Sequence, residues 1–182
     1  MKSTLRRTKS PIYTVVSIAL FTPVVAFGAM YLQLDGIEGE STNETHPKWI
    51  EIDSMQWGES RPASAGPSRA GVAGRTCASD IVVSKPLDKS SIGIMNNLAL
   101  MGKAIPKAKV SFTTNNGDSE QEYLLYELAS VSVTGYSVAS GGDRPSESVS
   151  LHFSTGKVTY KPVSIQGKVL SPVSTTIAGD GC

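Results

Sequence analysis

The amino-acid sequence predicts a mainly β fold, a small barrel or sandwich of short strands with one short α-helix. Apolar and polar residues alternate in many short runs, and turn-forming Gly, Asn, Asp and Ser residues separate these runs. A single stretch places its apolar residues at helical spacing instead. The 182 residues are enough to bury one independent hydrophobic core.

Composition narrows the classes of function. With 40% hydrophobic and 18% charged residues, the chain is too apolar for a disordered protein and too polar for a polytopic membrane protein. The formal net charge of +1 gives no electrostatic signal for binding nucleic acid. Two Cys exclude a disulfide-dense scaffold, and two His argue against a zinc enzyme.

Residues 1–28 have the pattern of a targeting segment rather than of a folded one. A basic start without acids precedes an uncharged apolar stretch, and Ala26 and Gly28 are the small residues expected before a cleavage after Gly28. We predict a signal peptide or membrane-anchor-like leader, hence a secreted or extracellular protein, with membrane contact only through an uncleaved leader. Translation starting at Met30, without this segment, is the alternative.

The first predicted strands cover Tyr31–Ile37 and Trp49–Trp57, which alternate apolar and polar residues and end near glycines. The Pro- and Gly-rich stretch from Arg61 to Arg75 predicts a long surface loop. Further alternating runs predict strands over residues 81–83, 109–113, 123–128, 131–138, 148–153 and 157–160. After Pro162 the tail is predicted to be flexible or to add an edge strand over residues 163–169.

One helix is predicted over residues 91–101, where it would plug or flank the barrel. Asp88 or Ser90 can cap its first turn, and Gly102 can end it. Its apolar residues share one face and predict core packing: Ile94, Met95, Leu98 and Met101.

No pattern in the sequence proposes a reaction. The sequence has enough residues for the catalytic pair of a Cys–His hydrolase. Its only thiols are Cys77 and Cys182, and its only imidazoles are His46 and His152. Neither histidine has a nucleophile signature beside it, and both are predicted to be structural. The sequence contains no Gly-x-Ser-x-Gly elbow, P-loop, dinucleotide motif or metal-ligand spacing. We therefore predict no enzyme, and no catalytic, cofactor-binding or metal-binding residues.

The two cysteines have another use in an oxidising compartment, where they can form one disulfide. A bridge between Cys77 and Cys182 would fasten the C-terminus within one chain or staple two subunits together. Two unpaired thiols are the remaining alternative.

Four segments together carry a resemblance to a known family. They are Tyr31–Ser41 with His46, Trp49–Ile52 and Gln56–Gly58; Asp80–Ile81 with Lys85–Ser91 and Gly102–Lys103; Ile105–Val110; and Gly141–Pro145 with Glu147–Leu151, Phe153 and Tyr160. In this order, over roughly residues 30–162, they resemble the haemolysin-coregulated protein (Hcp) family, the tube subunit of bacterial type VI secretion systems.

The resemblance implies an Hcp-like β-barrel of two sheets with one helix over residues 29–162, followed by a C-terminal extension over residues 163–182. It implies a structural homo-oligomer, with hexameric rings that stack into a tube, carry secreted effectors in the lumen and meet sheath and spike proteins. Such subunits are cytoplasmic before secretion. An exported filament, or an exported effector or binding module on the same fold, is the alternative.

The resemblance also implies site residues. The loop from Gly36 to Lys48 would reach neighbouring subunits, and the turn from Gly141 to Pro145 corresponds to a turn of the family. From the residues themselves, we expect Arg144 to pair with Asp143 either across a joint or within its own turn. The lumen candidates are Ser54 and Gln56. The subunit-interface candidates are Gly36, Ile37, Gly39, Glu40, Ser41, Lys48, Asp143 and Arg144.

Overall fold

The computed structural model describes residues 28–61, 76–99, 103–115, 120–164 and 169–179. Most of the predicted leader, the loop over residues 62–75, the predicted helix end at Met101 and Gly102, and Cys182 lie outside the described residues. The elements are β1 (Met30–Leu34), β2 (Ile50–Ile52), β3 (Ser54–Gln56), β4 (Glu59–Ser60), β5 (Cys77–Ala78), β6 (Ile81–Pro86), α1 (Ser90–Ala99), β7 (Ile105–Asn115), β8 (Glu120–Ala139), β9 (Ser146–Tyr160) and β10 (Val173–Ala178).

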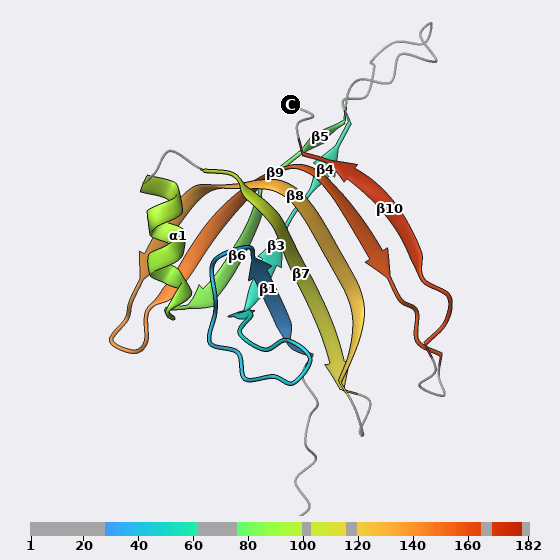
Figure 1. Ribbon diagram of the computed structural model, residues 1–182, viewed down its shortest axis with the longest axis horizontal. Helices are drawn as coiled ribbons and strands as arrows, with labels where there is room; N and C mark the ends of the chain where they lie inside the picture. Colours follow the sequence, from blue (N-terminus) through green and yellow to red (C-terminus); the bar gives the residue numbers. More distant parts are fainter. Residues whose placement is uncertain (1–27, 62–75, 100–102, 116–119, 165–168, 180–182) are drawn as a thin grey trace, which may run out of the picture.

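Eight of these strands form one antiparallel sheet in the order β2-β1-β7-β8-β9-β6-β3, with β10 also paired to β9. Because β2 and β3 follow each other directly in the chain, they join the two ends of this order and nearly close the sheet into a barrel (Figure 1). β4 and β5 form a second, two-stranded sheet. The predicted β-barrel with one helix is confirmed.

The predicted strand Trp49–Trp57 is divided at Asp53. The part before Asp53 pairs with β1, whereas the part after it pairs with β6. The Asp53 amide donates to the Ser84 carbonyl at 2.8 Å, so the chain changes neighbour without leaving the sheet. The sequence holds a faint sign of this division, because its inward apolar residues shift from even positions (Ile52) to odd positions (Met55).

Two pairs of predicted short strands are instead two long strands. β8 has 20 residues and β9 has 15, so the breaks predicted near residues 130 and 155 were wrong. In β8, Ser130 adopts a positive φ of 52°, and the register with β9 shifts between Val133 and Gly135. Such bulges bend a strand without ending it, which lets β8 follow the curve of the barrel.

The hydrophobic core lies inside the barrel and takes one face of each strand. Ile81 and Val83 of β6 face Leu151 and Val149 of β9 in register, and all four side chains are fully buried. Helix α1 flanks the barrel beside β8 rather than plugging it (Figure 1). Its apolar face is narrower than predicted, because Ile94 is fully buried but Leu98 is 37% exposed.

The tail adds a strand to the barrel, but not where the sequence predicted. Val163 and Val169 form only an isolated bridge, and the edge strand is β10, which pairs with β9 from Val173 to Ala178. Ile177 is buried against Gly156 and Leu128, where a larger residue than glycine would collide with it. The chain divisions after residues 28 and 162 stay predictions.

Candidate assembly surface

The loop between β1 and β2 folds back onto its own barrel. The Gly39 amide donates to the Lys48 carbonyl at 2.8 Å, and the Ser41 amide donates to the Trp49 carbonyl at 3.0 Å. A Cβ atom on Gly39 would lie 2.2 Å from the Trp49 carbonyl oxygen, so the close approach permitted by this glycine is to its own chain. Gly36 turns the chain with a φ of +83°, in the left-handed region that favours glycine.

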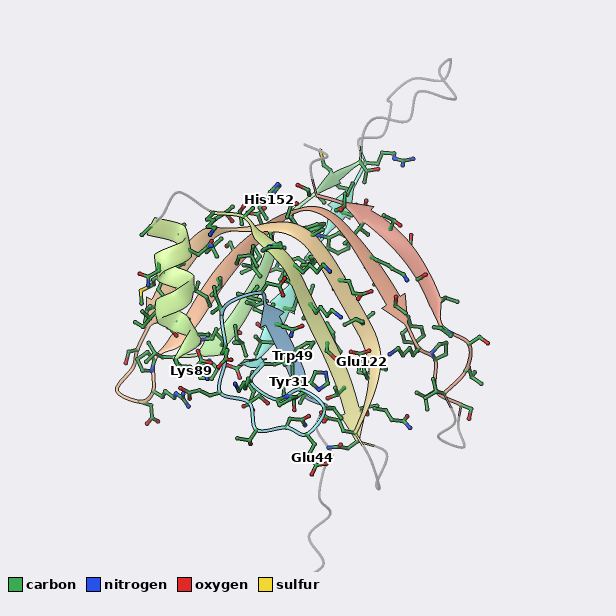
Figure 2. All side chains as sticks on the ribbon, in the orientation of Figure 1. Tyr31, Glu44, Trp49, Lys89, Glu122 and His152 are labelled. Atoms are coloured by element: carbon green, nitrogen blue, oxygen red, sulfur yellow. The ribbon has the colours of Figure 1, made fainter. Side chains whose placement is uncertain are left out.

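His46 anchors this loop in an aromatic cage. Its ring stacks on Tyr31 with centroids 4.5 Å apart and meets Trp49 edge-on at 4.7 Å. Its Nδ1 lies 2.7 Å from Thr45 Oγ1, and its Nε2 lies 2.9 Å from Ser111 Oγ. Figure 2 shows Tyr31, Trp49 and Glu122 at this part of the barrel, well away from His152. His46 is 5% exposed, so its role here is structural.

The loop meets the start of α1 and the β8–β9 turn through a set of exposed charges. Glu40 accepts from the Lys89 amide at 2.9 Å and lies 3.5 Å from Arg144 Nη2. Glu38 binds Lys48 at 3.1 Å and Lys89 at 3.3 Å. We call these five residues the loop–helix cluster; their side chains are about half exposed, from 46% to 69%.

A buried ionic network lies next to the loop–helix cluster, in the interior of the protein. Lys85 Nζ lies 2.6 Å from Glu147 and 2.8 Å from Asp88, and the side chains of Lys85 and Glu147 are fully buried. Ser91 of α1 and Tyr136 of β8 donate hydroxyl hydrogen bonds to the Glu147 carboxylate. Asp88 also caps α1 by accepting from the Ser90 amide at 3.0 Å.

Sequence reasoning missed this network, although one signal was present. Lys85 continues the alternation of Ile81 and Val83, so the pattern itself places its side chain inward. Burial of a lysine requires a paired carboxylate. Glu147, opposite Lys85 in the register of β6 with β9, supplies it.

Within one chain, Arg144 is paired with Glu40 and Leu87 rather than with Asp143 of its own turn, whereas a pair with Asp143 across a joint between subunits stays a prediction. Arg144 Nε donates to the Leu87 carbonyl at 2.7 Å, and its other partner is Glu40. Asp143 lies exposed in the turn. The structure therefore brings the two predicted interface segments, the loop and the turn, into one surface through Arg144.

The lumen candidates Ser54 and Gln56 lie on β3, and both are exposed. Ser54 Oγ is 2.6 Å from Ser84 Oγ of the neighbouring strand β6. Met55, between them, packs inward against the core. The two polar side chains thus project from the outer face of the barrel.

The remaining candidate chemistry is accounted for within the described part of the chain. Cys77 is disulfide-bonded and so offers no thiolate nucleophile, which removes the Cys–His hydrolase hypothesis. His152 Nδ1 lies 3.1 Å from Asp80, which also accepts from the Thr134 hydroxyl at 2.6 Å. Across the described ranges, no group of three or more His, Cys, Asp or Glu residues could hold a metal ion. No helix in those ranges is long and apolar enough to cross a membrane.

Comparisons with known proteins agree with this geometry. A model of the family described as "Type VI secretion system effector, Hcp" matches residues 31–160. Protein hcp1 of Pseudomonas aeruginosa is 31% identical over 140 residues, which cover 76% of this chain and 86% of that protein.

Solved structures give the same result. A type six secretion system protein superposes with a TM-score of 0.73 at 28% identity, covering 80% of this chain and 91% of its own. Hcp1 from Salmonella typhimurium superposes with a TM-score of 0.68 at 25% identity, covering 84% and 95%. The fold and these matches define a protein of the type VI secretion class, which is not a class of enzymes. The chain belongs to the Hcp family.

Proposed function

We propose that this protein is a self-assembling subunit whose rings, hexameric as the resemblance implies, stack into the tube of a type VI secretion system. The observation that carries the proposal is the loop–helix cluster. It exposes both signs of charge from three segments far apart in the chain, and the buried Lys85–Glu147 pair fixes it from below. A surface with both signs can meet a rotated copy of itself head to tail, as closed rings require.

The finer parts of the proposal rest on the family. Secreted effectors in the lumen, sheath and spike proteins as partners, and release from the cytoplasm to the outside are what a tube subunit of this family would have. Ser54 and Gln56 remain the lumen candidates, and the interface candidates remain those of the loop and turn.

Negative-stain microscopy and analytical ultracentrifugation of the purified chain test the assembly. We expect rings of constant diameter and a sedimenting species several times the mass of one subunit. A monomer at every concentration would overturn the ring function and would favour an exported effector or binding module on the same fold.

The cysteines belong to this proposal as well. The sequence has two cysteines and Cys77 is bonded, so we infer a Cys77–Cys182 bridge within one chain. Non-reducing electrophoresis is expected to show a single subunit; a dimer sensitive to reductant would mean that the bridge joins two subunits. Intact mass of the same sample shows whether the predicted leader over residues 1–28 is present.

A further inference from the structure

The hydrogen bonds around His46 define where its proton lies. The Ser111 hydroxyl donates to Glu122 Oε2 at 2.6 Å, so its oxygen is left to accept from His46 Nε2–H. His46 Nδ1 is then the unprotonated nitrogen, and it accepts from the Thr45 hydroxyl. In this state both nitrogens of the neutral His46 ring have a hydrogen-bond partner.

A second proton on Nδ1 would disturb this arrangement. The Thr45 hydroxyl would have to turn toward Asn43 Oδ1 at 2.8 Å or Glu120 Oε2 at 3.3 Å, and a charge would be buried between two aromatic rings. The titratable groups facing the cage come from several elements: Tyr31 of β1, Glu44 of the loop, Glu51 of β2, Glu120 and Glu122 of β8, and Lys161 after β9.

The charged groups around His46 do not cancel the lowering of its pKa by burial. Burial lowers the pKa of His46 below its ordinary value of 6.5, while the negative charges of Glu120 and Glu122 oppose that shift without overcoming it. Lys161 Nζ lies 2.6 Å from the Glu122 carboxylate. Its positive charge reduces the stabilisation that this carboxylate gives to a protonated His46 ring.

We propose that His46 is the positioning residue of the loop over residues 36–48, and that protonation of His46 releases this loop from the barrel. The inference rests on the proposed function only in assigning the loop to the contact between subunits. With the loop closed, Glu38, Glu40 and Lys48 stand in the loop–helix cluster; with it open, that cluster loses three of its five members.

The direction of the pKa shift of His46 determines how closure of the loop depends on pH. The closed loop binds fewer protons than the open loop, so closure is fully favoured above pH 6.5, the ordinary pKa, and weakens as the pH falls below it. One linked proton changes the ratio of closed to open loop by at most about tenfold per pH unit. Glu120 and Glu122 have pKa values lowered from 4.5, because hydrogen bonds and nearby positive charge outweigh their burial, so they titrate below this window.

Amide hydrogen exchange on the full chain, corrected for intrinsic rates, tests the inference between about pH 7.5 and about pH 5. The reporters are the hydrogen-bonded amides of Ser41, Lys48 and Trp49. We expect their protection to fall below pH 6.5, by no more than about tenfold per unit, in the wild type and in His152→Gln. His152 is the only other histidine, so it is the matched control. His46→Gln is expected to lose the dependence on pH.

Protection that does not change with pH in the wild type, or a dependence kept in His46→Gln, would overturn the inference. Because His46→Gln could fail to fold, a second measurement uses the wild type alone: an NMR titration of the His46 imidazole. Its midpoint is expected below 6.5, at the lower end of the pH range over which the loop amides lose protection, and a midpoint at or above 6.5 would contradict the inference. Loop opening that follows His46 in a protein forming no rings would support this inference while refuting the ring function.

Discussion

At the scale of single residues, Lys85 shows how a barrel tolerates a charge in its interior. Its ammonium contacts the Glu147 and Asp88 carboxylates, the Ser91 hydroxyl and the Pro86 carbonyl. A buried ion pair contributes little net stability over an apolar pair, but removing one partner leaves an uncompensated charge. The network therefore fixes the geometry of α1 against the barrel more than it adds to stability.

Lys85→Met is expected to destabilise the protein by about 3–5 kcal/mol, because Glu147 is left buried without its cation. Urea unfolding measures the loss. The double variant Lys85→Met/Glu147→Gln is the matched control, since it removes both charges of the Lys85–Glu147 pair and keeps an acceptor for Ser91 and Tyr136. It should recover part of the stability, because Asp88 also loses its cation but keeps the Ser90 amide. A loss below about 1 kcal/mol in the single variant would show that Glu147 is not held as a buried anion.

Tyr136 gives a prediction about alkaline pH. Burial and the hydrogen bond to Glu147 raise its pKa from 10.0 to about 12, and burial with the charge of Glu120 does the same for Tyr31. The stability that these phenols contribute is complete below pH 10.0 and is lost as the pH rises through about 12. Burial also raises the pKa of Tyr126, so an ultraviolet titration of the six tyrosines should show at least three that ionise late, and Tyr136→Phe should remove one of them.

At the scale of elements, the β1–β2 loop is shaped by contacts with its own barrel. Gly39 lies against the backbone of β2, Ile37 packs 3.0 Å from the position of a Cβ on Gly93 of α1, and His46 fills the cage. The loop is therefore ordered in the single chain, so binding to a partner does not carry the entropic cost of ordering it.

Gly39→Ala should detach this loop, because the new methyl group would collide with the Trp49 carbonyl. We expect a loss of about 1–3 kcal/mol in urea unfolding and faster amide exchange at Ser41. Gly58→Ala is the control, since nothing lies within 4 Å of its Cβ position, and it should change stability little. Equal effects of the two substitutions would contradict the close approach at Gly39.

At the scale of the whole molecule, the five half-exposed charges of the loop–helix cluster lie where the loop, the start of α1 and the β8–β9 turn meet. Arg144 and Glu40 are 104 residues apart in the chain and form part of one surface. Exposed ion pairs add little to the stability of one subunit, so in the proposed ring we assign this cluster to the contact between copies. Such contact should weaken as salt rises.

Lys48→Glu is expected to weaken ring formation about tenfold or more at low salt, because it places a second acid beside Glu38. Sedimentation at several protein concentrations measures the effect. Lys107→Glu, an equal charge change on exposed β7 outside the cluster, should assemble like the wild type. Equal weakening by both variants would mean that net charge, and not this surface, governs assembly.

The sequence by itself determined the mainly β class, the one helix, the family, and the inward or outward direction of most strand residues, whereas it left the helix cap open between Asp88 and Ser90. These properties depend on residues near one another in the chain, such as Ile81, Val83 and Lys85. The tertiary structure alone decided the division at Asp53, the fusion of short runs into β8 and β9, the place of β10, and the meeting of Lys85 with Glu147 and of Glu40 with Arg144. The physical reason is that alternation is a local property, whereas strand pairing and ion pairing join residues that approach only when the barrel closes.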